Sequence, residues 1–312
     1  MTEKYRPAYL ELLANGELQE RVTQAHARLS DCDICAHTCH IDRRAGELGT
    51  CKTGERARIS SYGPHMGEED PLRGTRGSGT IFMTRCNLRC QYCQNHDISQ
   101  TDSGHEVEPE DLANIMLELQ KRGCHNINFV SPSHVVPQIV AGVLIAAQAG
   151  LSIPLVYNTG GYDSLSTLML LDGIVDIYMP DMKYADTTLA ERYSGIKNYP
   201  QVNQAVVKEM HRQVGDLQLD LHGIATRGLL IRHLILPDNL AGTDQIVKFL
   251  ADEISKETYL NLMDQYRPAY RAHHYPELTR RITSVEFDTA VKMVQEAGLN
   301  RLDKRRAFMF SF

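Results

Sequence analysis

Seven of the eight cysteines fall into two short groups, a spacing typical of thiols that bind metals. The larger group places four cysteines within twenty residues: Cys32, Cys35, Cys39 and Cys51. The smaller group places three within eight residues: Cys86, Cys90 and Cys93. The remaining thiol, Cys124, stands alone and is expected to be packed. Because no secretory leader is visible, we predict that the grouped thiols do metal or redox chemistry rather than form disulfides.

The three-cysteine group fits one corner of a cuboidal iron–sulfur cluster. Three thiolates bind three irons and leave the fourth iron without a protein ligand, so that this iron becomes a binding site. A closed zinc site, the alternative, needs a fourth protein ligand, for which His96 is the nearest candidate. The spacing of Cys86, Cys90 and Cys93, with Tyr92 directly before the last thiol, favours the open cluster.

The four-cysteine group permits two kinds of site. Four thiols in a loop-rich segment fit a structural zinc that folds its own surroundings. The same thiols fit a second, auxiliary iron–sulfur cluster. His37 and His40 lie among them and add further possible ligands. The spacing leaves zinc and iron–sulfur open for this second site.

The composition is that of an ordinary globular chain. Hydrophobic residues make up 42% of its 312 residues and charged residues 23%, with a formal net charge of -6. The longest apolar run, 139–147, has nine residues, well short of the roughly 20 that a membrane helix needs. The acidic balance argues against a bulk nucleic-acid binder. We therefore expect a cytoplasmic protein that binds neither membrane nor nucleic acid.

Short β-rich runs alternate with helical stretches after residue 78, which indicates parallel βαβ units. The predicted strands are 79–84, 127–131, 155–159, 175–180, 229–236 and 259–263. The predicted helices are 7–30, 109–122, 134–149, 164–171, 200–215, 243–256 and 285–298. Residues 31–78 are expected to be loop-rich. About six units are too few for a closed eight-stranded barrel, so we predict an open α/β fold.

Polar side chains gather where these strands end. Asn158 lies at the end of one strand, and Arg232 lies within another. Asp181 and Lys183 follow a third and point to the same side if that strand continues. The carboxyl ends of parallel strands share one edge, where the sites of such folds lie. An acid, an amine and a guanidinium at this edge could bind a zwitterion such as a methionine group. The alternative is that Asp181 and Lys183 form a plain ion pair at the strand end.

The CxxxCxxC pattern at 86–93, with its tyrosine, resembles the signature of radical SAM enzymes. Three longer stretches resemble the PflX-type branch, relatives of the pyruvate formate-lyase activating enzyme: GTRGSGTIFMTRCNLRCQYCQNHDIS, DGIVDIYMPDMKYAD and YRPAYLELLANGELQERV. The resemblance covers nearly the whole chain. It implies an open (β/α)6 partial TIM barrel over 79–312, preceded by a small N-terminal cysteine-rich module over 1–78.

The resemblance also implies the reaction. A 4Fe-4S cluster on Cys86, Cys90 and Cys93 would cleave S-adenosylmethionine reductively to a 5′-deoxyadenosyl radical, which abstracts hydrogen from a protein or peptide substrate. In the activating enzymes, this hydrogen comes from a backbone glycine of a partner protein. A flavodoxin- or ferredoxin-type protein is the implied electron donor.

Individual residues take roles from the same resemblance. Asp181 and Lys183 match a D-x-K element that contacts S-adenosylmethionine or the substrate backbone. Arg232 matches an IR-x4-P element with the same role. From their positions rather than from the resemblance, Tyr92 beside the cluster is expected to stack on adenine, with ordinary packing as the alternative, and Asn158 is expected to approach the nucleoside or the methionine part.

The sequence departs from the commoner pattern after the second predicted strand. Many radical SAM proteins carry GGE there, whose acid meets the methionine ammonium, whereas this chain has NFVSPSHVVP. Ser131, Ser133 or His134 is expected to substitute. Gln265 and Tyr266 are further candidates for substrate contact, and the basic C-terminal tail is expected to be a solvated face or a lid.

Two alternatives stay open. The chain could be a radical SAM enzyme that modifies a small molecule or a peptide without forming a glycyl radical. It could instead be a non-enzymatic cysteine-rich protein that binds metal or transfers electrons. Cleavage of S-adenosylmethionine by the reduced, iron-loaded chain distinguishes the second alternative, and a glycyl signal in a partner protein distinguishes the first.

Overall fold

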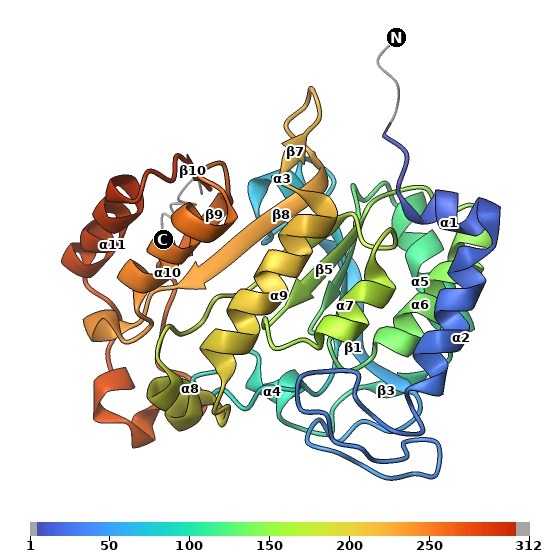
Figure 1. Cartoon of the computed structure of the whole chain (residues 1–312), viewed down its shortest axis with the longest axis horizontal. Coiled ribbons are helices and arrows are strands. Elements are labelled where there is room, and N and C mark those ends of the chain that lie inside the picture. Colours follow the sequence, from blue (N-terminus) through green and yellow to red (C-terminus); the bar gives the residue numbers. More distant parts are fainter. Residues whose placement is uncertain (1–4, 304–312) are drawn as a thin grey trace.

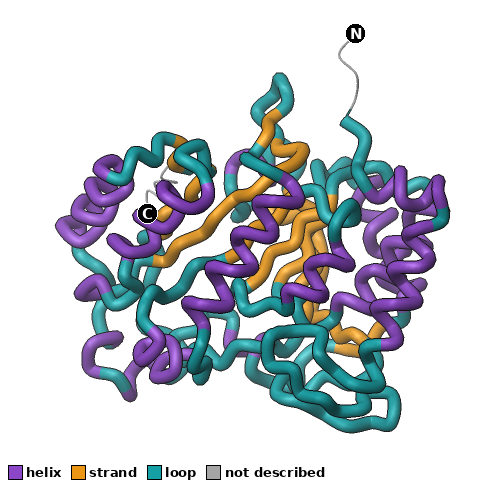
Figure 2. Tube along the Cα trace, viewed as in Figure 1, coloured by secondary structure: helices purple, strands orange, loops and turns teal. Residues whose placement is uncertain are grey.

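The computed structural model describes residues 5–303, and the basic tail from Lys304 onward lies outside them. These residues form a mixed α/β fold around one large sheet (Figures 1 and 2). The strands lie in the order β10-β9-β8-β6-β5-β4-β2-β1-β3, and β7 (Gln218–Leu219) pairs with β8 beside this path. Because β10 and β3 end this order, the sheet is open, as predicted.

Six parallel strands form the centre of the sheet, in the order in which they occur in the chain. They are β2 (Ser78–Met83), β4 (Ile127–Val130), β5 (Leu155–Thr159), β6 (Ile177–Pro180), β8 (Ala225–Leu234) and β9 (Tyr259–Met263). Each overlaps a strand predicted from the sequence, but β8 begins four residues before the predicted strand. A short further parallel strand, β10 (Arg301–Leu302), pairs with β9.

The predicted helices connect these strands. They are α5 (Pro109–Lys121), α6 (Val136–Gln148), α7 (Leu165–Leu171), α9 (Tyr199–Val214), α10 (Thr243–Phe249), which a π-helical turn (Leu250–Ile254) extends, and α11 (Ser284–Glu296). α5 begins with a capping box between Glu108 and Asp111 and with proline at its first position. α6 is buried along most of its length because α1, α2 and α5 pack around it.

The structure differs from the prediction in the segment before β2. β1 (Ala57–His65) pairs antiparallel with β2 and with β3 (His105–Val107), where a loop-rich segment is predicted. Only the first part of β1, around Ile59, is buried, so the strand lacks the apolar run that would reveal it. Three helices too short for a clear period were also missed: α3 (Asp70–Arg73), α4 (His96–Ser99) and α8 (Thr187–Ser194).

The predicted N-terminal helix at 7–30 is in fact two helices, α1 (Tyr9–Asn15) and α2 (Glu17–Ala27). Gly16 between them has a φ of 86°, a left-handed conformation that ends α1. Both helices pack on α6 and cover it from outside.

Side chains of the sheet divide between two faces. One face, with Tyr157 and Tyr178, joins the large core that the helices share. The other face, with Val156 and Ile177, joins a smaller inner core. The strand arrows in Figure 1 point to the edge where α4, α8 and the loops of 31–55 lie. This carboxyl edge is where folds of this kind carry their sites.

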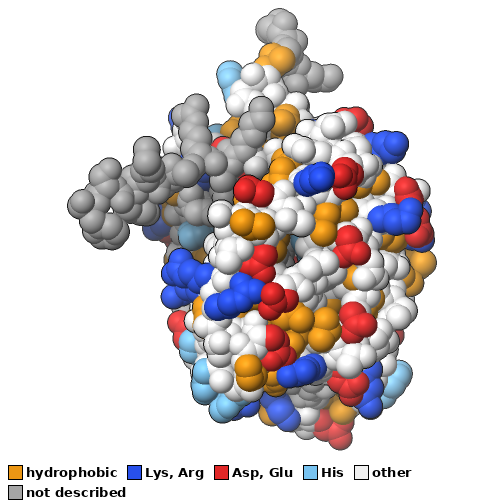
Figure 3. Space-filling view, turned by 90° about the vertical axis from the view of Figure 1, so that its left-hand side faces the viewer, with side chains coloured by type: hydrophobic (Ala, Val, Ile, Leu, Met, Phe, Trp, Pro, Cys, Tyr) orange, Lys and Arg blue, Asp and Glu red, His pale blue; other side chains and the backbone are white. Residues whose placement is uncertain are grey.

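The outer helices carry mixed charges. On the face formed by α10 and α11, acidic and basic side chains are interspersed (Figure 3), with ion pairs Lys248–Asp252 and Lys292–Glu296. Among residues 5–303, no helix combines the length and the apolar character that crossing a membrane requires.

Candidate functional site

The loop of Cys86, Cys90 and Cys93 leaves the carboxyl end of β2, at the edge where the sequence predicts it. Arg85 adopts the left-handed region, with a φ of 59°, and turns the chain away from the strand. Cys90 is buried, whereas Cys86 and Cys93 are partly exposed. The three thiols therefore lie at the edge of the sheet with access from outside.

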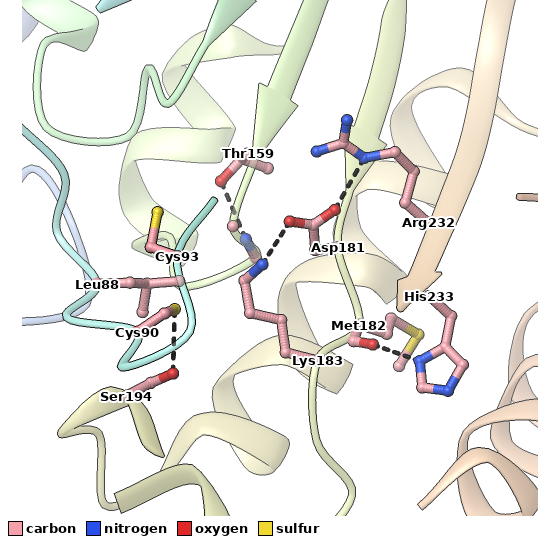
Figure 4. Close-up of polar contacts among 12 residues, drawn as sticks. Leu88, Cys90, Cys93, Thr159, Asp181, Met182, Lys183, Ser194, Arg232 and His233 are labelled. Carbon is pink, nitrogen blue, oxygen red and sulfur yellow. Dashed lines mark hydrogen bonds and ion pairs between the residues drawn. The ribbon is translucent and has the colours of Figure 1, made fainter. Parts of the chain in front are cut away.

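Hydrogen bonds to sulfur hold this loop. The Ser194 hydroxyl donates to Cys90 Sγ at 3.1 Å (Figure 4), and the Leu88 N–H donates to Cys86 Sγ at 3.4 Å. Donors of this kind favour the thiolate over the thiol. Ser194 lies 104 residues from Cys90 in the chain, so no local pattern in the sequence reveals it.

Burial disfavours the charged form of these thiols. It raises the pKa of Cys90 to about 12, although the positive charge of Lys183 acts in the opposite direction. Burial likewise raises the pKa of Cys86. Thiols bind metals as thiolates, so loading this loop has to release protons. The charge of Lys183 favours that release.

Asp181, Lys183 and Arg232 form a largely buried ionic group beside the cysteine loop (Figure 4). Asp181 Oδ2 accepts from Lys183 Nζ at 2.6 Å, and Oδ1 accepts from Arg232 Nε at 2.8 Å. Burial by itself raises the pKa of Asp181, but the charges of Arg232 and Lys183 outweigh it and lower the pKa. The carboxylate is therefore ionised and bridges two cations.

Two strand ends bring this ionic group together. Asp181 follows β6 and pairs with Arg232 of β8 as a parallel bridge, and the Met182 N–H donates to the Arg232 carbonyl at 2.8 Å. His233 Nδ1 donates to the Met182 carbonyl at 2.6 Å, and its Nε2 lies 2.9 Å from the Thr243 hydroxyl. The buried His233 thus holds the main chain at Met182, between Asp181 and Lys183.

The turn after β5 packs against the cysteine loop. A side chain at Gly160 would place its Cβ 2.5 Å from Leu88 Cδ1, so the two loops meet at a glycine. The Tyr199 hydroxyl donates to the Gly160 carbonyl at 2.8 Å and accepts from the Lys183 N–H at 3.1 Å. The β5 turn, the ionic group and the cysteine loop are therefore held as one unit.

Two residues predicted to bind the cofactor lie on β5 and in the cysteine loop. Asn158 is buried on β5, level with Val130 of β4 and Met179 of β6. Tyr92 is buried too, and its ring centre lies 5.8 Å from that of Tyr266. Their contacts with adenosine and substrate stay predictions.

His96, the candidate fourth ligand of a closed zinc site, stacks on Tyr270 with ring centres 5.0 Å apart. The Gln94 side chain donates to the Gln265 carbonyl at 3.1 Å. This bond ties the segment after β9 to the cysteine loop.

The three residues expected to replace the missing acid separate in the structure. Ser131 hydrogen-bonds to the Cys86 thiol. Ser133 lies 2.9 Å from the Thr159 hydroxyl. His134 lies away from the β2 loop cysteines and lines the cavity of the four-cysteine group. Of the three, Ser131 is therefore the residue that the structure brings to the cysteine loop.

The four-cysteine group surrounds a small cavity. All four of its cysteines line this cavity: Cys32, Cys35, Cys39 and Cys51. A side chain at Gly49 would place its Cβ 2.8 Å from Cys39 Sγ, so this thiol packs closely on the neighbouring loop. Burial raises the pKa of Cys35, and the charges of the other three thiols act in the same direction.

The two cysteine groups are neighbours in space. His37 Nε2 donates to the Asn87 carbonyl at 2.7 Å, and Arg89 donates to the Thr50 carbonyl. Each of these carbonyls lies one residue from a cysteine. Because backbone carbonyls accept both bonds, the contact could not be predicted from the residue types in the sequence.

The donors of the β2 loop fit an iron–sulfur cluster. Within residues 5–303, no three His, Cys, Asp or Glu side chains are placed so that they could hold one metal ion between them. A cuboidal cluster requires no such convergence, because each thiolate binds a different iron. Thiolates are also the ligands that iron–sulfur clusters prefer.

The comparisons with known proteins agree with this geometry. A family model described as the radical SAM superfamily matches residues 80–217, from β2 through the cysteine loop to β6 and beyond. An uncharacterized protein of Methanocaldococcus jannaschii is 30% identical over 299 residues, which cover 93% of this chain and 82% of that protein.

Solved structures resemble the chain at low identity. SuiB of Streptococcus suis bound to S-adenosylmethionine is 13% identical, with a TM-score of 0.48 over 68% of this chain and 45% of SuiB. HydG, a maturase of the FeFe-hydrogenase, is 13% identical, with a TM-score of 0.49 over 70% of this chain and 48% of HydG. The chain thus matches less than half the length of either protein.

The matched family model begins within β2 and includes both the CxxxCxxC loop and the ionic pair of Asp181 and Lys183. Enzymes with this domain use a 4Fe-4S cluster and S-adenosylmethionine. The protein described here is a member of the radical SAM superfamily.

Proposed function

We propose that this chain cleaves S-adenosylmethionine reductively and abstracts hydrogen from a protein or peptide substrate. The observation that carries the proposal is the adjacency of the three-thiol loop to the buried ionic group of Asp181, Lys183 and Arg232. A 4Fe-4S cluster on the three thiols supplies the electron that breaks a carbon–sulfur bond of S-adenosylmethionine.

The residues of the ionic group bind and orient a zwitterion. A carboxylate fits Lys183 and Arg232, since Arg232 directs its terminal nitrogens away from Asp181 (Figure 4). An ammonium fits Asp181, and the low exposure of this side chain, 12%, strengthens the attraction. Tyr92 and Asn158 are assigned to the adenosine part. The charges thus match the methionine part of the cofactor or the backbone of a peptide.

The substrate class follows from the resemblance to the PflX-type branch. We assign a protein partner whose backbone glycine loses hydrogen, as in the activating enzymes. A flavodoxin or ferredoxin is the assigned electron donor, and the cytoplasm is the assigned location. The group of Cys32, Cys35, Cys39 and Cys51 is assigned a second metal, either zinc or an iron–sulfur cluster.

Cleavage of S-adenosylmethionine tests the proposal. The chain is loaded anaerobically with iron and sulfide, reduced, and assayed for 5′-deoxyadenosine and methionine. Cys90→Ala removes a ligand and is expected to reduce cleavage to background. Cys124→Ala, which removes the thiol outside both groups, is the matched control and is expected to keep it.

Three outcomes decide between the alternatives. No cleavage by the fully loaded chain, with and without candidate partners, would contradict the radical reaction. A glycyl signal in a partner by electron paramagnetic resonance supports the activating type. Continued 5′-deoxyadenosine formation without that signal favours modification of a small molecule or a peptide.

A further inference from the structure

Two thiols of the β2 loop lie beside buried serine hydroxyls. Ser194, the last residue of α8, donates to Cys90 Sγ at 3.1 Å. Ser99, the last residue of α4, lies with its Oγ 3.2 Å from Cys93 Sγ. Ser194 is 0% exposed and Ser99 is 7% exposed. Bulk water therefore competes little with the sulfurs for either hydroxyl.

The end of α8 is fixed against the residues on both sides of Cys90. The Arg89 N–H donates to the Ser194 carbonyl at 3.3 Å, and the Gln91 N–H donates to the Tyr193 carbonyl at 2.7 Å. These two main-chain bonds hold the helix end in register with the cysteine loop. The hydroxyl of Ser194 is therefore placed by the fold and not by a mobile side chain alone.

The hydrogen of each hydroxyl is directed to sulfur. The Tyr184 hydroxyl lies 2.8 Å from Ser194 Oγ. A serine has one hydrogen, which Ser194 donates to Cys90, so Tyr184 is the donor in this pair. The Gln100 amide likewise donates to Ser99 Oγ at 3.3 Å. Because a metal-bound thiolate carries no hydrogen, Ser99 is the donor to the thiolate beside it.

The four-cysteine group lacks this arrangement. Within residues 5–303, its side-chain hydrogen bond to a thiol is the long contact between Thr50 and Cys39, at 3.8 Å. No serine hydroxyl of the described chain bonds to a thiol of that group. Buried serine donors thus belong to the loop to which the 4Fe-4S cluster is assigned.

We propose that Ser99 and Ser194 raise the reduction potential of the cluster on the β2 loop by donating hydrogen bonds to two of its thiolate ligands. Reduction adds one electron from the assigned flavodoxin or ferredoxin, while both hydroxyl hydrogens stay on the serines. Part of the added negative charge lies on the sulfurs, so donors to sulfur stabilise the reduced cluster more than the oxidised one.

The two serines are positioning residues, because they act through the thiolates. Ser194 donates to Cys90, which also lies within reach of the charge of Lys183. Ser99 acts on the other side of the loop, at Cys93. The effect rests on the 4Fe-4S cluster of the proposed function and is independent of the substrate.

The reduction potential of the cluster tests the proposal. The full chain is loaded anaerobically with iron and sulfide and titrated without S-adenosylmethionine, while electron paramagnetic resonance follows the reduced cluster. The signal of the first site is the one that Cys90→Ala removes. Ser99→Ala and Ser194→Ala should each lower the equilibrium constant for reduction about threefold to tenfold. A tenfold change is about 59 mV for one electron.

Three further measurements separate this effect from a loss of packing. In the double variant, the two shifts should roughly add, because the two thiolates bind different irons. Ser99→Thr keeps a hydroxyl and should keep the potential. Ser78→Ala is the matched control and should keep it too, because the buried Ser78 hydroxyl donates to Asn126 Oδ1 at 2.6 Å and not to sulfur.

A label decides the question where an alanine variant does not fold or does not retain its cluster. In deuterated water, hydroxyl hydrogens exchange rapidly, whereas a buried N–H exchanges slowly. Pulsed electron paramagnetic resonance of the unchanged, reduced chain should therefore show rapidly exchanging deuterons coupled to the cluster. Absence of this coupling would overturn the proposal without any substitution.

The outcomes distinguish this proposal from the radical reaction. Unchanged potentials in Ser99→Ala, Ser194→Ala and the double variant, or an equal shift in Ser78→Ala, would overturn the role of the serines alone. The expected shifts in a chain that does not cleave S-adenosylmethionine would contradict the proposed function alone. A chain that takes up no four-iron cluster would overturn both.

Discussion

The two cysteine groups touch each other, yet their surroundings differ. The β2 loop lies beside the ionic group of Asp181, Lys183 and Arg232, and two of its thiols are partly exposed. The cavity of the four-cysteine group is lined by apolar side chains such as Ile34 and Ile41, and three of its thiols are buried. Accessible thiols beside charges suit a site that binds a charged molecule, whereas an enclosed cavity suits a group that stays bound.

The difference shows that two groups with the same cysteine ligands can form different kinds of site. Lys183 places a positive charge within reach of Cys86 and Cys90. In the second cavity, Arg43 is engaged by backbone carbonyls and holds the main chain in place. The charged residues around each cysteine group, rather than the thiols themselves, therefore decide which of the two groups is suited to bind a substrate.

The largest effect is expected from removing the charge at the centre of the ionic group. Asp181→Asn leaves the largely buried cations of Lys183 and Arg232 without their partner, so the free energy of unfolding should fall by about 3 kcal/mol. Chemical denaturation of the metal-free chain measures it. Affinity for S-adenosylmethionine should fall in parallel, while the metal content of the second cavity should stay the same.

The matched control for this change is an exposed ion pair. Asp238 pairs with Arg280 on the surface, where water screens the attraction, so Asp238→Asn should alter stability far less. Equal losses for the two variants would show that the ionic group beside the β2 loop has no special stability, and the contrast between the two cysteine groups would weaken.

A smaller effect is expected where the β5 turn meets the cysteine loop. Gly160→Ala would bring a methyl group to 2.5 Å from Leu88 Cδ1, and the resulting overpacking should cost about 1–3 kcal/mol. Iron bound at the first loop should fall, and the metal content of the second cavity should not. Gly54→Ala, whose Cβ would meet Leu48 only at 3.8 Å, is the control. Loss of metal from both sites in Gly160→Ala would mean that the two loops load as one unit.

The pH dependence of stability should report the buried histidine beside the ionic group. Burial lowers the pKa of His233 from 6.5 to about 4, so the unfolded chain takes up a proton that the folded chain refuses. Stability from this residue is present above pH 6.5 and is lost as the pH falls toward 4. His233→Gln should reduce that slope by up to about 1.4 kcal/mol per pH unit.

Denaturation of the metal-free chain at several pH values measures this slope. The exposed His105, changed to Gln, is the control and should leave the slope in place. An unchanged slope in His233→Gln would assign the acid sensitivity to other groups of the fold.

The smallest effect is expected at the thiol outside both groups. Cys124 is buried, so Cys124→Ala should lower the free energy of unfolding by roughly 1 kcal/mol through lost packing. The metal content of both sites should stay that of the unchanged chain. A loss of iron in this variant would show that metal analysis responds to general destabilisation, and the other comparisons would need correction for it.

Much of the fold was predictable because its signals are local. The apolar runs of the parallel strands, such as 155–159, and the periodic helices between them appear at nearly the predicted residues. β1 and α8 escaped because one is largely exposed and the other spans two turns. Gly16 divides the first helix because a left-handed residue ends α1, which apolar periodicity does not register.

The sequence by itself determined the cysteine groups, the parallel strands and the carboxyl edge at which the first group lies. Only the tertiary structure decided that Ser194 donates to Cys90, that His134 joins the four-cysteine cavity and that His37 bonds to the neighbouring loop. The physical reason is that such contacts join distant parts of the chain, and many end on backbone carbonyls. Every residue has a backbone carbonyl, so the sequence does not show which carbonyls accept these hydrogen bonds.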